Sequence, residues 1–400
     1  MRRTSTTPPF SSPLLSSLPK PLLEIFSSYA EAMMPSFSCR FPATRRLRRL
    51  RSLPFLLLLF ALLTGSALGR GRHVIAIPAA VPFPRGLAWD PSAQHFLVGS
   101  RLSHAAVYSV SDAGVAEALV SDLLLPSSSS VAALTVDDRR RRLLISLARP
   151  AALAAYDLRS PRPHRRIFLS SFPDPSAVPG GVAVDPKTGS AFITAGSVVL
   201  KADLDGTASV LSRSAIYGAD PSSEGLGAVA HVSHGFLLVV ERGGTGRMFK
   251  VDEEDGAAKE VLRKGVGAAA EGIAVRSDGG AVLARGGAGT RWLRSRDGWG
   301  DAAVQDEAAV EEGWQATAVA VREGRRAYVL VTPGEEEGGE EKKVRRIEEV
   351  EWGKEGEGEM VWGFVLIGLG LAYFCYWRFQ MGQLVSNLNK KRAYNNRETA

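Results

Sequence analysis

A short phrase recurs through the middle of this chain and constrains its fold more than any other feature. The phrase has the form small, apolar, small, apolar, and then a polar residue, often Asp. Its six copies follow one another at intervals of 45 to 48 residues, at Gly86–Asp90, Ala133–Asp137, Gly181–Asp185, Gly227–His231, Gly272–Arg276 and Ala318–Arg322. A fixed period of this length is typical of repeat architectures, in which each copy is one supersecondary unit.

Each copy of the phrase begins a strand, and a turn and a second apolar strand follow it. After Asp185, for example, the turn at 186–189 leads into the apolar run 191–194. Pro and Gly between runs of β-branched and aromatic residues indicate hairpins. Small residues in the first strand suit a crowded axis on which the inner strands of all units converge. We therefore predict an all-β, six-bladed β-propeller over residues 70–352.

Charge and cysteine content place further bounds on the chain. It has 49 basic and 42 acidic residues, but much of the excess lies near the N-terminus and in the last 25 residues, so we predict no nucleic-acid partner. Arg139–Arg142 falls at a hairpin turn, where we expect a solvated loop. Cys39 and Cys375 lie outside the predicted propeller, so no disulfide can close it. Closure must come from strand pairing, in which a segment at 74–77 or 344–350 completes the blade begun by the other terminus.

The first 69 residues are predicted to be an N-terminal extension followed by a secretory signal peptide. A basic segment at 45–51 precedes an apolar segment at 53–63 and the small residues of 67–69. This order, ending in a small-x-small cleavage site, is typical of signal peptides. Translation from Met33 or Met34 would omit the Ser- and Pro-rich extension, and the sequence leaves open which start is used.

An uncharged run near the C-terminus predicts a transmembrane helix at 360–378. Residues 360–377 contain 18 residues without a charge, with aromatic residues at both ends. An acidic stretch precedes the run, and basic residues follow it at 378 and 390–392. The positive-inside rule then places a cytosolic tail at 379–400, which we expect to be disordered from residue 382. We predict a single-pass type I membrane protein of the secretory pathway or plasma membrane, with a lumenal or extracellular propeller.

Two of the repeats resemble a known family. The segments FPRGLAWDP at 83–91 and VPGGVAVDPKTG at 178–189 are similar to units of the senescence marker protein and gluconolactonase (LRE-like) family, within the calcium-dependent phosphotriesterase superfamily. They also resemble NHL repeats, and the nearest likeness is to membrane-anchored plant proteins that carry this domain. The resemblance covers nearly all of 74–350 and implies a six-bladed propeller.

The same resemblance implies a calcium ion in the central channel, held by acids and Asn residues just before the inner-strand phrases. The corresponding positions here are Arg85, Ala132, Gly180, Leu226, Glu271 and Thr317. Only Glu271 keeps an oxygen anion, and the chain has no Asn before Asn387. We therefore expect either no cofactor or a Ca²⁺ ion that uses Glu271 with acids from nearby loops, the available ones being Asp174, Asp220 and Glu224.

Other candidate sites are weaker, and two functions of different class remain open. His231 and His234 have the spacing of a metal pair on a helix, but on a strand residues three apart point to opposite faces. Our main hypothesis is a non-enzymatic binding or scaffold module with a degenerate metal site, which takes a protein or small ligand on a propeller face. The alternative is a calcium-dependent lactonase or esterase with remodelled ligands; a propeller resembling strictosidine synthase would need a channel acid, for which Glu271 is the candidate. The channel-rim candidates are Arg85, Glu271 and Thr317.

Overall fold

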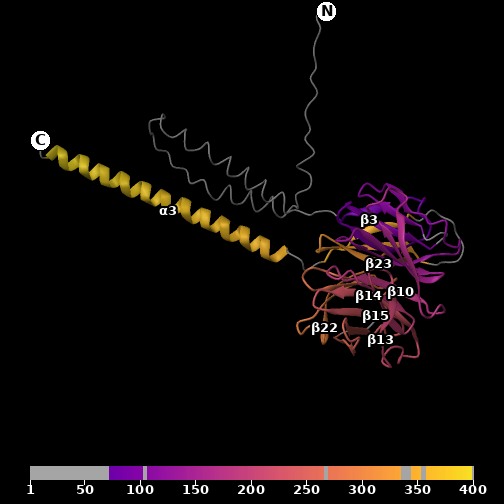
Figure 1. The fold of residues 1–400 in the computed structure, drawn as a ribbon. Coiled ribbons are helices and arrows are strands. Elements are labelled where there is room, and N and C mark those ends of the chain that lie inside the picture. Colours follow the sequence, from indigo (N-terminus) through magenta and orange to yellow (C-terminus); the bar gives the residue numbers. More distant parts are fainter. Residues whose placement is uncertain (1–71, 102–105, 265–268, 335–343, 353–356, 399–400) are drawn as a thin grey trace, which may run out of the picture. The chain divides into compact units, whose positions relative to one another are not determined.

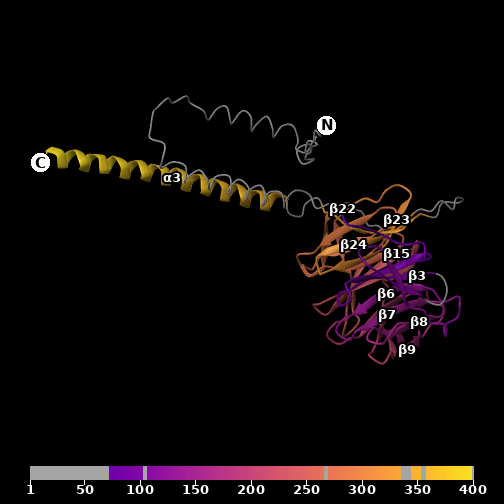
Figure 2. The ribbon, with the colours of Figure 1, turned by 90° about the horizontal axis from the view of Figure 1, so that it is seen from above.

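The computed structural model describes residues 72–101, 106–264, 269–334, 344–352 and 357–398. The predicted extension and signal peptide at 1–69 lie outside these residues, and so does Cys39. The described strands form six sheets, which confirms the predicted all-β, six-bladed propeller (Figure 1). Figure 2 shows one of these sheets, β6 to β9, with its four strands side by side.

The blades are numbered here in the order of their inner strands. Blade 1 contains β2 (Pro84–Asp90), β3 (His95–Ser100), β4 (Val107–Val110) and β5 (Ala116–Val120), and blade 2 contains β6 (Val131–Asp137), β7 (Arg142–Ala148), β8 (Ala151–Asp157) and β9 (Arg165–Ser171). Blade 3 contains β10 (Pro179–Val184), β11 (Ala191–Ala195), β12 (Val198–Ala202) and β13 (Ala208–Arg213), and blade 4 contains β14 (Ser223–Val232), β15 (Phe236–Gly243), β16 (Met248–Asp252) and β17 (Ala258–Glu260). Blade 5 contains β18 (Leu262–Lys264), β19 (Gly272–Val275), β20 (Ala281–Ala284), β21 (Thr290–Arg294) and β22 (Asp301–Ala308), and blade 6 contains β1 (Val74–Ala76), β23 (Trp314–Arg322), β24 (Arg326–Pro333) and β25 (Arg346–Glu349).

Both ends of the propeller domain contribute to its closure. Strand β25 pairs with β24, and the N-terminal strand β1 then pairs antiparallel with β25, placing Val74 opposite Glu348. Blade 6 is therefore built from residues at the two ends of the domain. Because this pairing ties the first strand to the last blade, it holds the ring together without a disulfide.

The six phrases form the inner strands β2, β6, β10, β14, β19 and β23, and each of these strands contacts the inner strands of the two neighbouring blades. The small residues of the phrase are required by this crowding. A Cβ atom on Gly181 would lie 2.6 Å from the main-chain nitrogen of Val229, and one on Gly272 would lie 3.1 Å from the Cα of Ala318. These short distances explain why the inner strands need small side chains at the axis.

The hydrophobic core lies between adjacent blades. At the junction of blades 1 and 6, the ring of Phe96 packs against Trp89 and Tyr328, with centroid separations of 4.8 Å in both pairs. Ile75 of β1 and Ile347 of β25 are buried in the same cluster. The closing strands are thus held by apolar packing as well as by main-chain hydrogen bonds.

The C-terminal helix α3 spans Glu357–Glu398 and is much longer than the segment predicted at 360–378. It continues through the range that we expected to be a disordered tail; residues 383–394 contain no Gly or Pro and several good helix formers, so helical structure continues. Within the described part of the chain, we find no helix that is both long enough and apolar enough to cross a membrane. The predicted transmembrane span is therefore not confirmed.

Candidate functional site

Five of the six inner strands share an irregularity near the point where the phrase begins. The pairing between the first and second strands of blade 2 contains one extra residue, Ala132, and the same pairing in blade 6 contains Thr317. Blades 1, 3 and 4 also show register shifts near the start of the phrase. Such β-bulges bend a strand and redirect its side chains, and they are frequent beside functional sites.

The bulged positions line a cavity on the propeller axis, which we call the channel mouth. The cavity has a volume of about 70 Å³, and all six inner strands contribute to it. It brings together five of the six positions that the sequence singled out: Arg85, Ala132, Gly180, Glu271 and Thr317. The sixth, Leu226, is buried in the core between blades 3 and 4, and blade 4 instead contributes Ala228, Val229 and Arg242.

Positive charge dominates the channel mouth. Arg85 Nη2 lies 3.8 Å from Glu271 Oε2, and the two side chains are 29% and 43% exposed. Burial lowers the pKa of Arg85, and the charges of Arg101 and Arg242 lower it further, while Glu271 acts in the opposite direction. One carboxylate therefore faces a group of guanidinium ions that repel one another.

Two larger cavities open from the channel mouth and share Arg85, Arg101 and Glu271. Their volumes are about 490 Å³ and 510 Å³, within the range of small-molecule sites. Together the charged residues that line them are five arginines and two glutamates, a net charge of +3: Arg85, Arg101, Arg149, Arg242, Arg345, Glu224 and Glu271. Thr317 also lines the first of the two cavities, and its hydroxyl donates to the Leu330 carbonyl at 3.3 Å.

Sequence reasoning missed most of these arginines, although a signal for them exists. An arginine lies within one residue of the end of the second strand in four blades: Arg101, Arg149, Arg242 and Arg285. Because the second strand runs antiparallel to the first, its end lies beside the start of the phrase. Recurrence of arginine at this offset could have predicted a basic channel mouth.

The described residues do not fit the calcium ion that the family resemblance implies. Ca²⁺ takes six to eight oxygen ligands, whereas Ala132 and Gly180 offer no side-chain oxygen and Arg85 repels a cation. Of the three acids expected in loops, Glu224 lies instead in strand β14 and lines the cavity of about 510 Å³ together with Glu271. Asp174 and Asp220 instead accept hydrogen bonds from Ser176 and Ser222 in their own turns.

The opposite end of the channel, which we call the far face, carries the last residue of each phrase. Several of these residues tie neighbouring blades together. Arg322 of blade 6 contacts Asp112 of blade 1 at 2.8 Å, and Asp90 of blade 1 accepts from Arg141 of blade 2 at 2.6 and 3.0 Å. Between blades 3 and 4, Asp185 and His231 lie together with Glu253, in a group whose ligand atoms could hold a metal ion.

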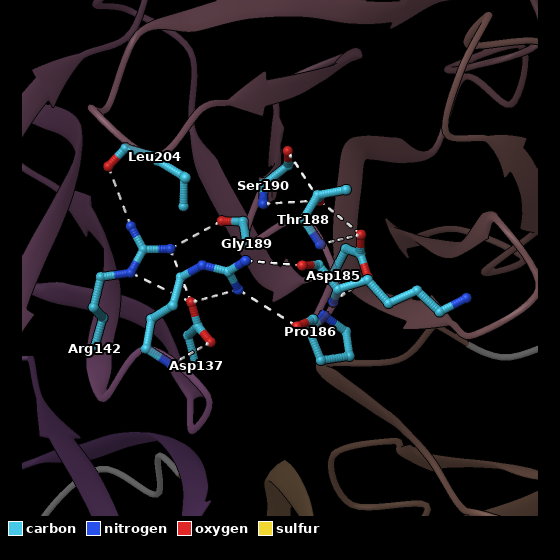
Figure 3. A network of polar contacts seen from close by, with 10 residues as sticks. Asp137, Arg142, Asp185, Pro186, Thr188, Gly189, Ser190 and Leu204 are labelled. Carbon is cyan, nitrogen blue, oxygen red and sulfur yellow. Dashed lines mark hydrogen bonds and ion pairs between the residues drawn. The ribbon is translucent and has the colours of Figure 1, made fainter.

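The Arg139–Arg142 run takes part in these contacts, and our prediction of a solvated loop was wrong for most of it. Arg142 is buried and binds Asp137 and the carbonyl oxygens of Gly189 and Leu204 (Figure 3). Arg140 likewise donates to main-chain carbonyls of the turn in blade 3. Only Arg139 is exposed. The hairpin turn of blade 2 is placed against blade 3, so its guanidinium groups bind across the junction.

Comparison with known proteins shows the fold. No model of a known protein family matches the chain, and no curated protein sequence matches it. Among solved structures, the allergen Mala s 1 of Malassezia sympodialis aligns with a TM-score of 0.53 and 15% identity, over 71% of this chain and 96% of that one. A gluconolactonase from Xanthomonas campestris aligns with a TM-score of 0.51 and 12% identity, over 70% and 90%.

A third neighbour is a catalytically inactive virginiamycin B lyase from Staphylococcus aureus, crystallised with quinupristin. It aligns with a TM-score of 0.50 and 12% identity, over 66% of this chain and 82% of that one. At such identities the likeness establishes architecture alone. The chain therefore has a six-bladed β-propeller fold, and its architecture is similar to that of a gluconolactonase, an allergen and a lyase.

Proposed function

We propose that this protein is a non-enzymatic binding module whose channel mouth takes a small anionic ligand. The observation that carries the proposal is the set of five arginines against two glutamates in the connected cavities at the channel mouth. Arg85 and Glu271 are both partly exposed, so a ligand can reach them from solvent. Guanidinium groups form paired hydrogen bonds with carboxylate or phosphate oxygens, and this geometry favours a ligand that carries one of these groups.

The charge balance also explains why binding is favoured over hydrolysis assisted by a metal. The rim positions that would supply calcium ligands carry Arg85, Ala132 and Gly180, and a cation would meet a positive potential there. Burial is the main cause of the lowered pKa of Arg85, and a bound anion would offset the repulsion by Arg101 and Arg242 that lowers it further. A hydrogen bond to a charged group contributes about 1.5–3 kcal/mol.

A calcium-dependent lactonase or esterase remains the second candidate. It is favoured by one observation, which is that Glu224 and Glu271 line the same cavity of about 510 Å³. Two carboxylates that line one cavity could contribute oxygen ligands to a cation there. The fold shared with a gluconolactonase is compatible with this function.

Membrane anchoring is a further part of the proposal. Its support is the run of 18 uncharged residues at 360–377, with basic residues after it, and the exposure of large apolar side chains of α3, among them Ile367, Leu371 and Phe374. The same asymmetry of charge favours a lumenal or extracellular propeller and a cytosolic C-terminus. Resistance of the chain to carbonate extraction, and protection of the propeller from added protease in sealed microsomes, test this part.

The binding proposal is tested by calorimetry on the purified full-length chain with citrate, inorganic phosphate and, as a neutral probe, glucose. We expect an anion to bind and glucose not to bind. Arg85→Met and Arg242→Met should each weaken anion binding by about 10-fold or more, which corresponds to about 1.4 kcal/mol. Arg139→Met is the matched control, because Arg139 is an exposed arginine outside the lining of the channel-mouth cavities.

Two results would overturn this proposal. The first is a folded protein that binds neither anion at millimolar concentration, or that loses binding equally in Arg139→Met. The second is turnover of gluconolactone that requires added Ca²⁺ and is lost in Glu271→Gln, which would establish the second candidate instead.

A further inference from the structure

The junction between blades 3 and 4 contains a group of three possible metal ligands on the far face. Asp185 follows β10 of blade 3, while His231 in β14 and Glu253 after β16 belong to blade 4. Their ligand atoms all lie within 4.8 Å of one another. His231 Nε2 lies 2.8 Å from Glu253 Oε2 and 3.9 Å from Asp185 Oδ1. One imidazole nitrogen thus faces two carboxylate oxygens from different blades.

The group is shielded from solvent, and its side chains are held in place by further contacts. The side chains of Asp185 and His231 are 4% and 7% exposed, and that of Glu253 is 25% exposed. The ring of His231 stacks on Phe192 at 6.0 Å, with 6° between the planes. These contacts fix the direction of Nε2 before any ion binds.

The Asp185 carboxylate is positioned in the same way. Its Oδ2 accepts hydrogen bonds from the main-chain nitrogen and the hydroxyl of Thr188, as Figure 3 shows for Asp185 and Thr188. Its Oδ1 accepts one bond, from the Lys187 nitrogen. A carboxylate oxygen has two acceptor positions, so one position on Oδ1 is open, and Oδ1 is the atom nearer to His231. Metal-binding carboxylates are commonly held by such outer hydrogen bonds.

Charge distinguishes this junction from the one between blades 1 and 2 and the one between blades 2 and 3. Asp90 faces Arg141 and Asp137 faces Arg142, so each of these acids meets a guanidinium ion. Asp185 faces His231, which also contacts Glu253. Lys201 donates to the main-chain oxygen of Glu253 at 3.3 Å. Two carboxylates share one imidazole here, whereas each of those two junctions has a permanent cation.

We propose that Asp185, His231 and Glu253 bind a Zn²⁺ ion that links blade 3 to blade 4. Zinc bonds to imidazole nitrogen and carboxylate oxygen are about 2.0–2.2 Å long, which places two ligand atoms of a tetrahedral ion about 3.4 Å apart. The observed separations of 2.8 and 3.9 Å bracket that value. The nitrogen donor favours Zn²⁺ over Ca²⁺, which prefers oxygen ligands. This site is separate from the channel mouth.

The test uses the purified full-length chain, stripped with chelator and titrated with Zn²⁺ against a competing chelator of known affinity. We expect one tight equivalent per chain, and Zn²⁺ should raise the melting temperature. His231→Ala should weaken binding by more than about 100-fold, because losing even an outer-shell partner of a metal ligand costs 10- to 100-fold. His234→Ala, an exposed histidine three residues away, should bind as the wild type does.

A second variant and a spectroscopic measurement keep the test decisive if His231→Ala does not fold. Glu253→Gln changes a partly exposed side chain by one atom, and it should weaken binding while circular dichroism stays unchanged. Co²⁺ should give visible absorption bands in the wild type and in His234→Ala that are absent from Glu253→Gln. The proposal is wrong if the folded wild type binds no Zn²⁺, if His231→Ala or Glu253→Gln binds it as tightly as the wild type, or if His234→Ala loses it equally.

Discussion

The tie between blades 2 and 3 gives the sharpest prediction on stability. The side chains of Arg142 and Asp137 are 8% and 0% exposed, and Arg142 Nη2 donates to Asp137 Oδ2 at 2.9 Å. The same guanidinium donates to the Gly189 carbonyl at 3.0 Å and to the Leu204 carbonyl at 3.2 Å. Arg142→Met removes all of these bonds and leaves the Asp137 carboxylate buried without its main partner.

The magnitude follows from what remains around Asp137. Removing one member of a buried ion pair costs about 3–5 kcal/mol in the free energy of unfolding. Arg140 Nη1 stays 3.6 Å from Asp137 Oδ2, so we expect a cost near the lower end, about 3 kcal/mol. The double variant Asp137→Asn with Arg142→Met should be at least about 1 kcal/mol more stable than Arg142→Met alone, because it removes the uncompensated charge.

Urea denaturation of the full-length chain, followed by circular dichroism, measures these differences. The dependence of the unfolding free energy on urea should be the same in all variants, so that midpoints report stability. Arg139→Met is the control, and as an exposed side chain it should change stability by less than about 0.5 kcal/mol. A cost of Arg142→Met as small as that of Arg139→Met would refute the reasoning, and so would a double variant less stable than Arg142→Met.

Two further predictions concern the loss of stability in acid and the close packing of glycine at the propeller axis. Burial alone would raise the pKa of Asp90, but hydrogen bonds from Arg141 and from the Ala93 and Ser92 nitrogens keep that pKa below its usual range. The resulting stability is present above a pH of about 3.9 and is lost as the pH falls through the lowered pKa. Arg141→Met should reduce this acid sensitivity, which urea unfolding measured from pH 7 to pH 3 would show. An unchanged dependence of stability on pH would contradict this prediction. Gly181→Ala should lower the free energy of unfolding by about 1–3 kcal/mol, because the added Cβ would meet Val229. Gly287→Ala has room for the added atom and should change the urea midpoint little. Equal shifts of the urea midpoint in the two variants would show that the axis is less crowded than described.

Sequence periodicity alone was enough to predict the architecture. Six phrases at nearly equal spacing, each followed by a turn and a second strand, can bury their apolar faces only against copies of themselves, and the number of copies sets the number of blades. The phrase also identified Arg85, Glu271 and Thr317, because a repeated unit places equivalent residues at equivalent heights on the axis. These three line connected cavities at the channel mouth.

What the tertiary structure decided is which residues from different repeats meet. Arg101 follows the second strand of blade 1 and Arg242 lies near the end of the second strand of blade 4, and only strand pairing places them near Arg85. Arg142 reads as part of an exposed turn until the neighbouring blade covers it. Glu253 joins Asp185 only because its carboxylate contacts His231 at the junction of blades 3 and 4. Periodicity describes one unit and its repeats, whereas charge pairing across a junction depends on how each unit packs against the next. The sequence therefore determined the propeller fold and the end of the inner strands at which the channel rim lies. Packing between blades determined the charge of the channel mouth and the contacts on the far face.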